Sequence, residues 1–473
     1  MPDQPSVVRS AADVVRSLDR VAHVEGERLV VDDEAALRDR VARDLAWTSA
    51  FSEDEAAIEA ARWIVWEAAQ ALGCRSASIH DLYMARAKGE VHGLTVPAIN
   101  VRAQTFDMAA TIFEAADAGD VGSFIFELAR SEQTYTYQRP AEYATSVLAA
   151  AIARGWRGPV FIQGDHYQFN AAKYTADPEK MTEEIRAACR TAIQAGYRNI
   201  DIDSSTLVDL SKPTVDEQQR ENYRRAAELT ALIRELEPDD VTISVGGEIG
   251  EVGKKNSTEE ELRAYLDGYR RELEGRAPGA PGISKVSVQT GTSHGGVPLP
   301  DGSVAQVQLE FDVLKRLGEV ARREYGLAGC VQHGASTLPD ELFHHFPAVE
   351  TAEIHLATGF QNLLFDHQAF PEDLRQRIDQ WCRKSVEDQR KPDETDQQFV
   401  YKTRKMAIGP FKRELWELPT KDEILVAQRR KVAFLFTELG VNGSRPMVER
   451  YISAPEHHRR VPDSLREAVA AAP

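Results

Sequence analysis

Eight short apolar runs, each followed by a longer amphipathic stretch, constrain the fold of this chain more than any other feature. The runs are VPAINV (96–101), SFIFEL (123–128), PVFIQG (159–164), NIDID (199–203), VTISVGG (241–247), ISKVSVQ (283–289), AGCVQ (328–332) and TAEIHL (351–356). The stretches between them, such as EEIRAACRTAIQAG, carry apolar residues at helical spacing, and several end in glycine, a common helix stop. Eight successive strand–helix units predict an α/β fold, the (β/α)8 or TIM barrel, with a parallel sheet inside a ring of helices.

The chain is longer than such a barrel requires. A barrel needs about 250 residues, whereas this chain has 473. Residues 1–90 carry apolar positions at helical spacing with acidic residues at the segment starts, so we predict a helical N-terminal extension. The barrel is expected over 91–370. The alternation then stops, and 371–473 is predicted to be a charged, C-terminal helical extension with a tail.

Charge and cysteine usage exclude several kinds of partner. The formal net charge of −18 argues against nucleic acid or an anionic membrane, because both bind basic surfaces. The N-terminal residues lack the apolar core of a signal peptide, and no apolar run approaches the roughly 18 residues of a membrane span. The four cysteines are widely spaced, without a C-x-x-C pair, which indicates reduced thiols. We therefore expect a cytoplasmic protein, and an anionic small-molecule substrate remains possible because a local cationic pocket can lie inside an acidic protein.

Unusual polar residues follow the apolar runs, where the chemistry of such barrels lies. They are Asn100 after the first run, Asp165 and His166 after the third, Asp203 after the fourth, Glu248 after the fifth, His294 and Gly295 after the sixth, His333, Gly334 and Ser336 after the seventh, and His355 and Thr358 at the eighth. A single histidine is usually structural. Three histidines at the ends of the third, sixth and seventh strands would converge on one cavity, and three neutral imidazoles suit zinc or another borderline divalent metal.

In these motifs the chain resembles the class II, metal-dependent ketose-bisphosphate aldolases. VPAINV is similar to the family's first strand, QGDHYQ to its Asp-His segment, DIDSS to its Phe-Asp-Gly-Ser segment and GGEIG to its Glu-x-Glu-Leu-Gly segment. GTSHG matches directly, QHGAS is close to the family's His-Gly-Gly-Ser, and EIHLAT resembles its Ile-Asn-Ile-Ala-Thr. The resemblance covers about residues 75–365, with the motifs in the family's order.

The resemblance implies a role for each of these residues. His166, His294 and His333 would bind the divalent metal, for which zinc is the first expectation, and Asp165 would handle the proton on the C4 hydroxyl. Glu248 is assigned with Asp165 to the catalytic group, as an alternate metal ligand or a partner of the ligands, and Asp203 would orient a ligand histidine. The substrate-binding residues are then predicted to be Asn100, Asp203, Gly295, Gly334, Ser336, His355 and Thr358. The family also implies a homo-oligomer, a dimer or a tetramer.

Several departures from the family pattern affect substrate recognition rather than the metal. The Tyr-Lys that follows His-Gly in the family is replaced by Gly-Val-Pro-Leu-Pro (296–300), and the loop acid after the fifth strand falls near Lys254-Lys255-Asn256. The family's strand-8 Asn is His355, and its phosphate-contacting Ser is replaced near Ala129. A phosphate dianion needs cationic or amide donors, so these changes leave the sugar and its phosphorylation open.

Three functions are consistent with the sequence. The leading hypothesis is a class II aldolase that reversibly cleaves a ketose phosphate, a ketose bisphosphate or a related sugar to a dihydroxyacetone-phosphate-like fragment and an aldehyde. The second is a metal-dependent sugar epimerase on the same barrel, which would release no fragment. The third is a non-catalytic subunit that stabilises a partner aldolase, for which a degraded metal site is expected. All three histidines and Asp165 are present, which argues against the third.

Overall fold

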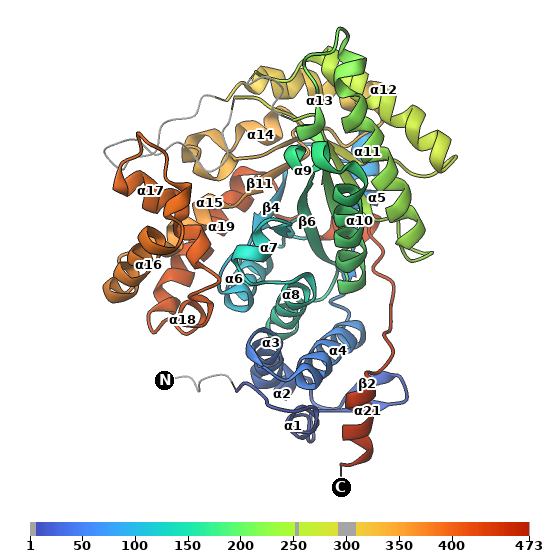
Figure 1. Ribbon diagram of the computed structural model, residues 1–473. Coiled ribbons are helices and arrows are strands. Elements are labelled where there is room, and N and C mark those ends of the chain that lie inside the picture. Colours follow the sequence, from blue (N-terminus) through green and yellow to red (C-terminus); the bar gives the residue numbers. More distant parts are fainter. Residues whose placement is uncertain (1–5, 251–254, 292–308, 473) are drawn as a thin grey trace.

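A closed barrel of eight parallel strands forms the centre of the computed structural model (Figure 1), which describes residues 6–250, 255–291 and 309–472. The strands are β4 (Val96–Asn100), β5 (Ile125–Ala129), β6 (Val160–Gln168), β7 (Asn199–Asp203), β8 (Ser244–Glu248), β9 (Lys285–Ser287), β10 (Cys330–Gln332) and β11 (Glu353–Leu356). They pair in chain order, and the pairing of β11 with β4 and of β6 with β7 closes the sheet. Each strand lies within or at one of the eight apolar runs, so the predicted (β/α)8 barrel is confirmed.

The helices between the strands cover the barrel from outside. They include α6 (Thr105–Ala118), α8 (Pro140–Arg154), α10 (Pro178–Ala195), α11 (Val215–Leu236), α12 (Glu259–Arg276), α13 (Phe311–Tyr325) and α15 (Thr358–Phe365). Proline at the first position starts α8 and α10, where its missing N–H costs no hydrogen bond. Gly155 and Gly196 end these helices in the left-handed conformation that glycine adopts without strain. These local signals explain why helices follow strands so regularly.

The N-terminal segment packs as a small layer against α8. It contains α1 (Ala11–Ser17), a hairpin of β1 (Ala22–Glu25) and β2 (Arg28–Val31), α3 (Ala42–Phe51), α4 (Glu55–Leu72), β3 (Ser76–Ala77) and α5 (His80–Ala87). The segment is thus mainly helical, with a hairpin that the helical spacing did not predict. The two residues of β3 pair in parallel with the start of β6, outside the closed ring.

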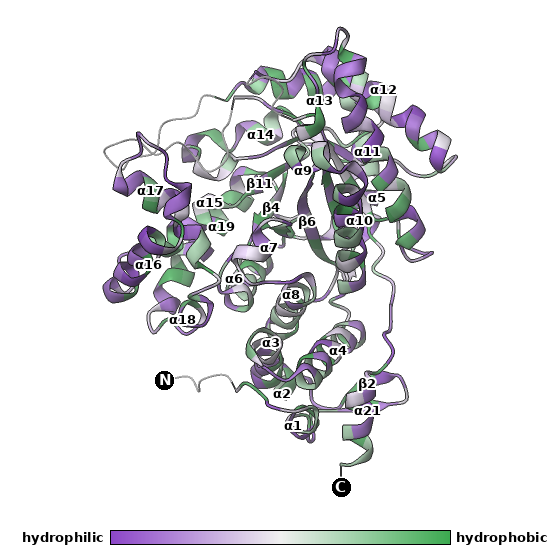
Figure 2. Ribbon diagram, viewed as in Figure 1, coloured by the Kyte–Doolittle hydropathy of each residue, from purple (hydrophilic) through white to green (hydrophobic). Residues whose placement is uncertain are grey.

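The C-terminal segment extends the ring of helices and then returns to the N-terminal layer. It comprises α16 (Glu372–Ser385), α17 (Asp396–Thr403), η6 (Arg404–Ala407), α18 (Lys412–Trp416), α19 (Lys421–Glu438), α20 (Arg445–Tyr451) and α21 (Asp463–Ala470). Helix α19 packs on α6, and α21 contacts α1 and α4 at the bottom of the view in Figure 1. Helices α16 and α17 are largely hydrophilic (Figure 2), and they enclose a second, smaller apolar core with Phe365, Phe370 and Phe399. The boundaries at residues 90 and 370 stay predictions.

Within the described ranges, none of the helices combines the length and the apolar character needed to cross a bilayer.

Candidate active site and metal centre

A bulge in β6 brings two consecutive side chains to the mouth of the barrel. The pairing of β6 with β7 skips from Gly164 to Tyr167, and His166 adopts a φ of +44°, in the left-handed region that costs a non-glycine residue about 1–2 kcal/mol. In a regular strand consecutive side chains point to opposite faces, and a bulge breaks that alternation. As a result Asp165 and His166 both reach the site, with Oδ2 of Asp165 lying 3.7 Å from Nε2 of His166.

His166 lies between two further carboxylates on neighbouring strands. Its Nδ1 is 3.3 Å from Oδ2 of Asp203 on β7 and 3.6 Å from Oε2 of Glu248 on β8. Asp203 is itself fixed, because its Oδ1 accepts hydrogen bonds from the backbone N–H and the hydroxyl of Ser205, at 3.1 and 2.6 Å. Asp203 therefore contacts the Nδ1 side of the His166 ring, and its role in orienting a ligand histidine stays a prediction.

His333, directly after β10, completes a candidate metal group with residues from β6 and β8. Its ring lies 4.4 Å from that of His166, and its Nε2 is 2.9 Å from the hydroxyl of Ser287. Ligand atoms of His166, Glu248 and His333 all lie within 4.8 Å of one another, as do those of Asp165, His333 and His355 and those of Asp201, Glu353 and His355. Two imidazoles and a carboxylate suit a divalent cation such as zinc. His294 and Gly295, also predicted for this site, lie outside the described residues.

The pKa values of the two acids assigned to catalysis, Glu248 and Asp165, are shifted in opposite directions. Burial and the adjacent Asp203 carboxylate raise the pKa of Glu248 to about 8. Burial also opposes the charge on Asp165, but the His166 and His355 rings outweigh it and hold the pKa of Asp165 well below its usual range. Asp165 is therefore ionised, whereas Glu248 retains a proton near neutral pH when no cation replaces it. Pairs of acids with separated pKa values are typical of catalytic sites.

A charged layer fills the barrel interior next to this site. Nζ of Lys285 on β9 lies 2.8 Å from Oε1 of Gln163 and 2.9 Å from Oδ2 of Asp201, and it is also paired with Glu353 on β11. Burial alone would lower the pKa of Lys285, but Asp201 and Glu353 raise it above its ordinary value. A Schiff base requires a neutral amine, so this buried, ion-paired ammonium does not provide the covalent aldol route.

Sequence reasoning missed the members of this layer, although a signal was present. Each is a charged residue inside an otherwise apolar run: Glu127 in SFIFEL, Asp201 in NIDID, Lys285 in ISKVSVQ and Glu353 in TAEIHL. All four are buried. A charge that is fully removed from water is nearly always paired, so these four positions were candidates for one interior network.

A cavity of about 210 Å³ contains most of the predicted substrate-binding residues. Its lining includes Asn100, Asp165, His166, His333, Gly334, Ser336, His355 and Thr358, together with Arg102, Glu132, Tyr135 and Lys405, which the sequence did not single out. A second cavity, of about 640 Å³, adjoins His166 and Glu248 on the other side and is lined by Arg130, Ser131, Gln168 and Ser205 among others. His166 and Ser131 line both cavities, so the candidate metal group lies where the two meet.

One wall of the smaller cavity carries two cationic side chains in different environments. Arg102 is paired with Glu132, Nη2 to Oε1 at 2.6 Å, and Glu132 also accepts a hydrogen bond from the Asn100 amide at 2.6 Å. Lys405 comes from η6, and among the described residues no carboxylate lies within ion-pair distance of its Nζ, which faces the Tyr135 ring at 5.9 Å. Burial and the nearby Arg102 lower the pKa of Lys405. In the sequence, Lys405 was one of many basic residues in the C-terminal segment, and no motif marked it as part of a site.

The barrel carries at its mouth a group of histidines and acids that could hold a divalent metal ion. The chain belongs to the class II fructose-bisphosphate aldolase family, whose family model matches residues 82–410. The predicted resemblance is therefore confirmed at the level of the family. No curated protein sequence matches the chain.

Solved structures resemble this chain in fold at low sequence identity. A probable tagatose 6 phosphate kinase from Sinorhizobium meliloti 1021 has a TM-score of 0.53 at 16% identity, covering 80% of this chain and 97% of its own. The YdjI aldolase from Escherichia coli K12 has a TM-score of 0.44 at 16% identity, over 78% and 99% of the two chains. Fructose-bisphosphate aldolase from Campylobacter jejuni has a TM-score of 0.46 at 16% identity, over 78% and 97%.

Proposed function

We propose that the protein is a metal-dependent aldolase that reversibly cleaves a ketose phosphate, or a related sugar, to a dihydroxyacetone-phosphate-like fragment and an aldehyde. The observation that carries the proposal is the convergence of His166, Glu248 and His333 beside Asp165 at the mouth of the barrel. Family membership supports the same reaction class. A homo-oligomeric state and a cytoplasmic location stay predictions.

The residues present fit a divalent cation. His166, His333 and Glu248 would hold it, with His294 as the further predicted imidazole, and zinc suits this nitrogen-rich donor set. When bound, such a cation supplies electrostatic stabilisation for the enediolate that forms when the bond beside the carbonyl breaks. Asp203 contributes by fixing the orientation of the His166 ring.

Asp165 is the proposed proton-handling group. In the cleavage direction its carboxylate accepts the proton from the hydroxyl on the carbon that becomes the aldehyde, and in synthesis it returns that proton. Its Oδ2 faces the site next to Nε2 of His166, while the rest of the side chain is buried. A carboxylate held ionised in this position is ready to act as the base.

Lys405 and Arg102 are proposed to recognise an anionic end of the sugar. The Lys405 ammonium lines the same cavity as Asn100 and Ser336, and among the described residues it has no carboxylate partner. The side-chain oxygen of Asn100 is buried there without a hydrogen-bond partner within the described residues, so it remains available to a substrate hydroxyl. A phosphate that leaves water needs charged hydrogen-bond donors in place of its hydration shell. The two cationic side chains therefore favour a phosphorylated substrate.

A product assay on the metal-loaded protein tests the proposal. Fructose 1,6-bisphosphate, tagatose 1,6-bisphosphate and the unphosphorylated ketoses are each incubated with enzyme whose metal content has been measured. The expected result is a triose fragment and an aldehyde from a phosphorylated ketose, lost in His333→Ala. Conversion to an epimer without fragments would replace the proposal with the epimerase. Full activity in both His333→Ala and a metal-stripped sample would overturn the role of the metal.

A further inference from the structure

His355, on β11, lies among four carboxylates that come from three other strands and from its own. Its Nδ1 is 2.9 Å from Oε2 of Glu127 and 3.3 Å from Oδ1 of Asp165. Its Nε2 is 2.7 Å from Oε1 of Glu353 and 3.7 Å from Oδ2 of Asp201. Both ring nitrogens therefore face carboxylate oxygens, and an imidazole meets such oxygens as a hydrogen-bond donor.

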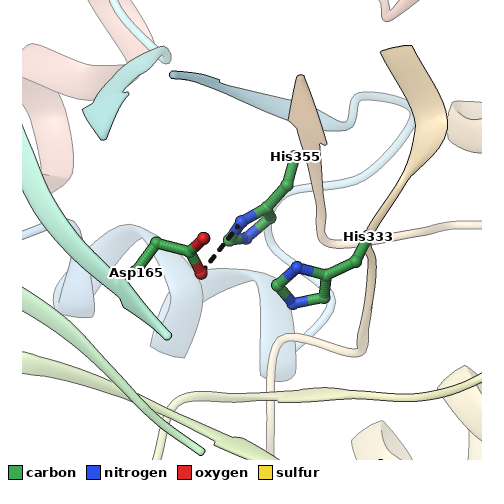
Figure 3. A group of neighbouring side chains, drawn as sticks. All are labelled: Asp165, His333 and His355. Atoms are coloured by element: carbon green, nitrogen blue, oxygen red, sulfur yellow. Dashed lines mark ion pairs between the residues drawn. The ribbon is translucent and has the colours of Figure 1, made fainter. Parts of the chain in front are cut away.

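The Asp165 carboxylate is divided between two environments. Its Oδ2 faces Nε2 of His166. Its Oδ1 is buried without a hydrogen-bond partner among the described residues, and it forms an ion pair with His355. Figure 3 shows the carboxylate and the His355 ring directed toward one another, with His333 beside them. One oxygen is thus available for chemistry while the other is anchored.

The His355 ring is itself held from several sides. Glu353, which faces Nε2, is fixed by the Lys285 ammonium, by the Tyr83 hydroxyl and by the Gln163 amide at 2.9 Å. The ring also lies 4.1 Å from the ring of His333 at an interplanar angle of 39°. A group whose own contacts are fixed can impose its orientation on a neighbour. The interior charged layer is therefore connected to Asp165 through a single imidazole.

We propose that His355 is a positioning residue: the ion pair between its Nδ1 and Oδ1 of Asp165 holds that oxygen, so that Oδ2 is directed toward the substrate hydroxyl. The bulge in β6 leaves Asp165 paired with β5 but not with β7, directly before a residue in a left-handed conformation, so a side-chain contact is needed to fix the direction of its carboxylate. This inference rests on the proposed function, since it takes Asp165 as the proton-handling group. It reinterprets the sequence-based prediction that His355 binds substrate.

Two substitutions separate the two nitrogens of the ring. The amide nitrogen of Asn occupies the place of Nδ1, so His355→Asn keeps a donor toward Asp165. The amide of Gln reaches the place of Nε2, so His355→Gln keeps the donor toward Glu353 and loses the one toward Asp165. Both variants place a polar, uncharged side chain at this position, so they lose the charge of the His355 ring to the same extent. A purely structural role predicts similar damage from both.

The experiment compares kcat, KM, bound metal and Tm in wild type, His355→Asn and His355→Gln. We expect His355→Gln to lower kcat by about 10- to 100-fold, the usual cost of losing a partner that orients an active group, with KM and metal content unchanged. His355→Asn is expected to keep most of the wild-type kcat. Equal losses in the two variants, a rise in KM alone, or loss of metal in His355→Gln would each overturn the proposal.

Failure of the proposed function is distinguishable, because it appears as absence of cleavage by the wild type. If His355→Gln does not fold, crystal structures of the wild type and of His355→Asn decide the question. A donor nitrogen on residue 355 within about 3.5 Å of Oδ1 of Asp165 in both structures supports the proposal. An Asp165 carboxylate turned away from residue 355 in the wild type overturns it.

Discussion

Nζ of Lys285, at the start of β9, lies 2.9 Å from Oδ2 of Asp201, on β7, in the closed interior of the barrel. The lysine side chain is 1% exposed, and it also meets Glu353 and Gln163. This pair joins strands that are separated in the barrel by β8, so it ties together parts of the sheet that do not share backbone hydrogen bonds.

Removing the charge of Lys285 is therefore expected to destabilise the protein. Lys285→Met leaves Asp201 and Glu353 buried without their cation, and breaking a buried pair in this way costs roughly 3–5 kcal/mol. Urea unfolding of the metal-loaded protein measures the change in the free energy of unfolding. Arg460→Met, which removes an ion pair with Asp463 whose side chains are 76% and 75% exposed, is the control and should leave stability unchanged. Equal unfolding midpoints for Lys285→Met and wild type would contradict the prediction.

Metal affinity is expected to rise with pH because a cation has to displace the proton on Glu248. Burial and Asp203 raise the pKa of this carboxyl to about 8 in the metal-free protein, so below that pH binding releases a proton. Each released proton makes the affinity about tenfold stronger per pH unit, between about pH 6 and 8. Competition with a chromogenic chelator at several pH values measures the slope.

Glu248→Gln provides the matched test of this pH dependence. It cannot release a proton, so its slope should be lower than that of the wild type by about one proton, and its affinity at pH 8 should be weaker. Identical slopes for the two proteins would show that Glu248 does not compete with the cation for its proton.

Asp165→Asn should lower turnover while leaving the metal in place. The amide has nearly the same shape as the carboxylate but cannot accept the substrate proton, and loss of a general base typically costs about 10²–10⁴-fold in rate. We expect kcat to fall within that range, with KM changed little and metal content unchanged. An unchanged kcat would assign the proton transfer to another group.

The barrel could be predicted from the sequence because its strands are buried on both faces and read as continuous apolar runs. The polar residues that follow the apolar runs also predicted which side chains lie together at the mouth of the barrel. In the structure, His166 has three of them as neighbours: Asp203, Glu248 and His333. This success depends on a property of the fold, since all parallel strands end at the same edge.

Contacts that depend on register were beyond the sequence pattern. The bulge that brings Asp165 and His166 to the same face follows from a skipped pairing between β6 and β7, and no change in the apolar pattern of PVFIQGDHYQ marks it. The pairing of Lys285 with Glu353 spans β10, which lies between their two strands in the sheet. Lys405 reaches the cavity because η6 folds back from a segment whose charged, helical pattern predicted only a C-terminal extension of the barrel.

Lys405→Met is expected to discriminate between phosphorylated and unphosphorylated substrates. A hydrogen bond to a charged group contributes about 1.5–3 kcal/mol, so its loss should raise KM for a ketose phosphate by roughly 10- to 100-fold. The same variant should leave KM for an unphosphorylated ketose unchanged, because that sugar carries no anionic group with which the Lys405 ammonium could pair. Steady-state kinetics on both substrates measure the difference. Lys384→Met, at an exposed position on α16, is the control, and an equal effect of the two substitutions would exclude Lys405 from anion recognition.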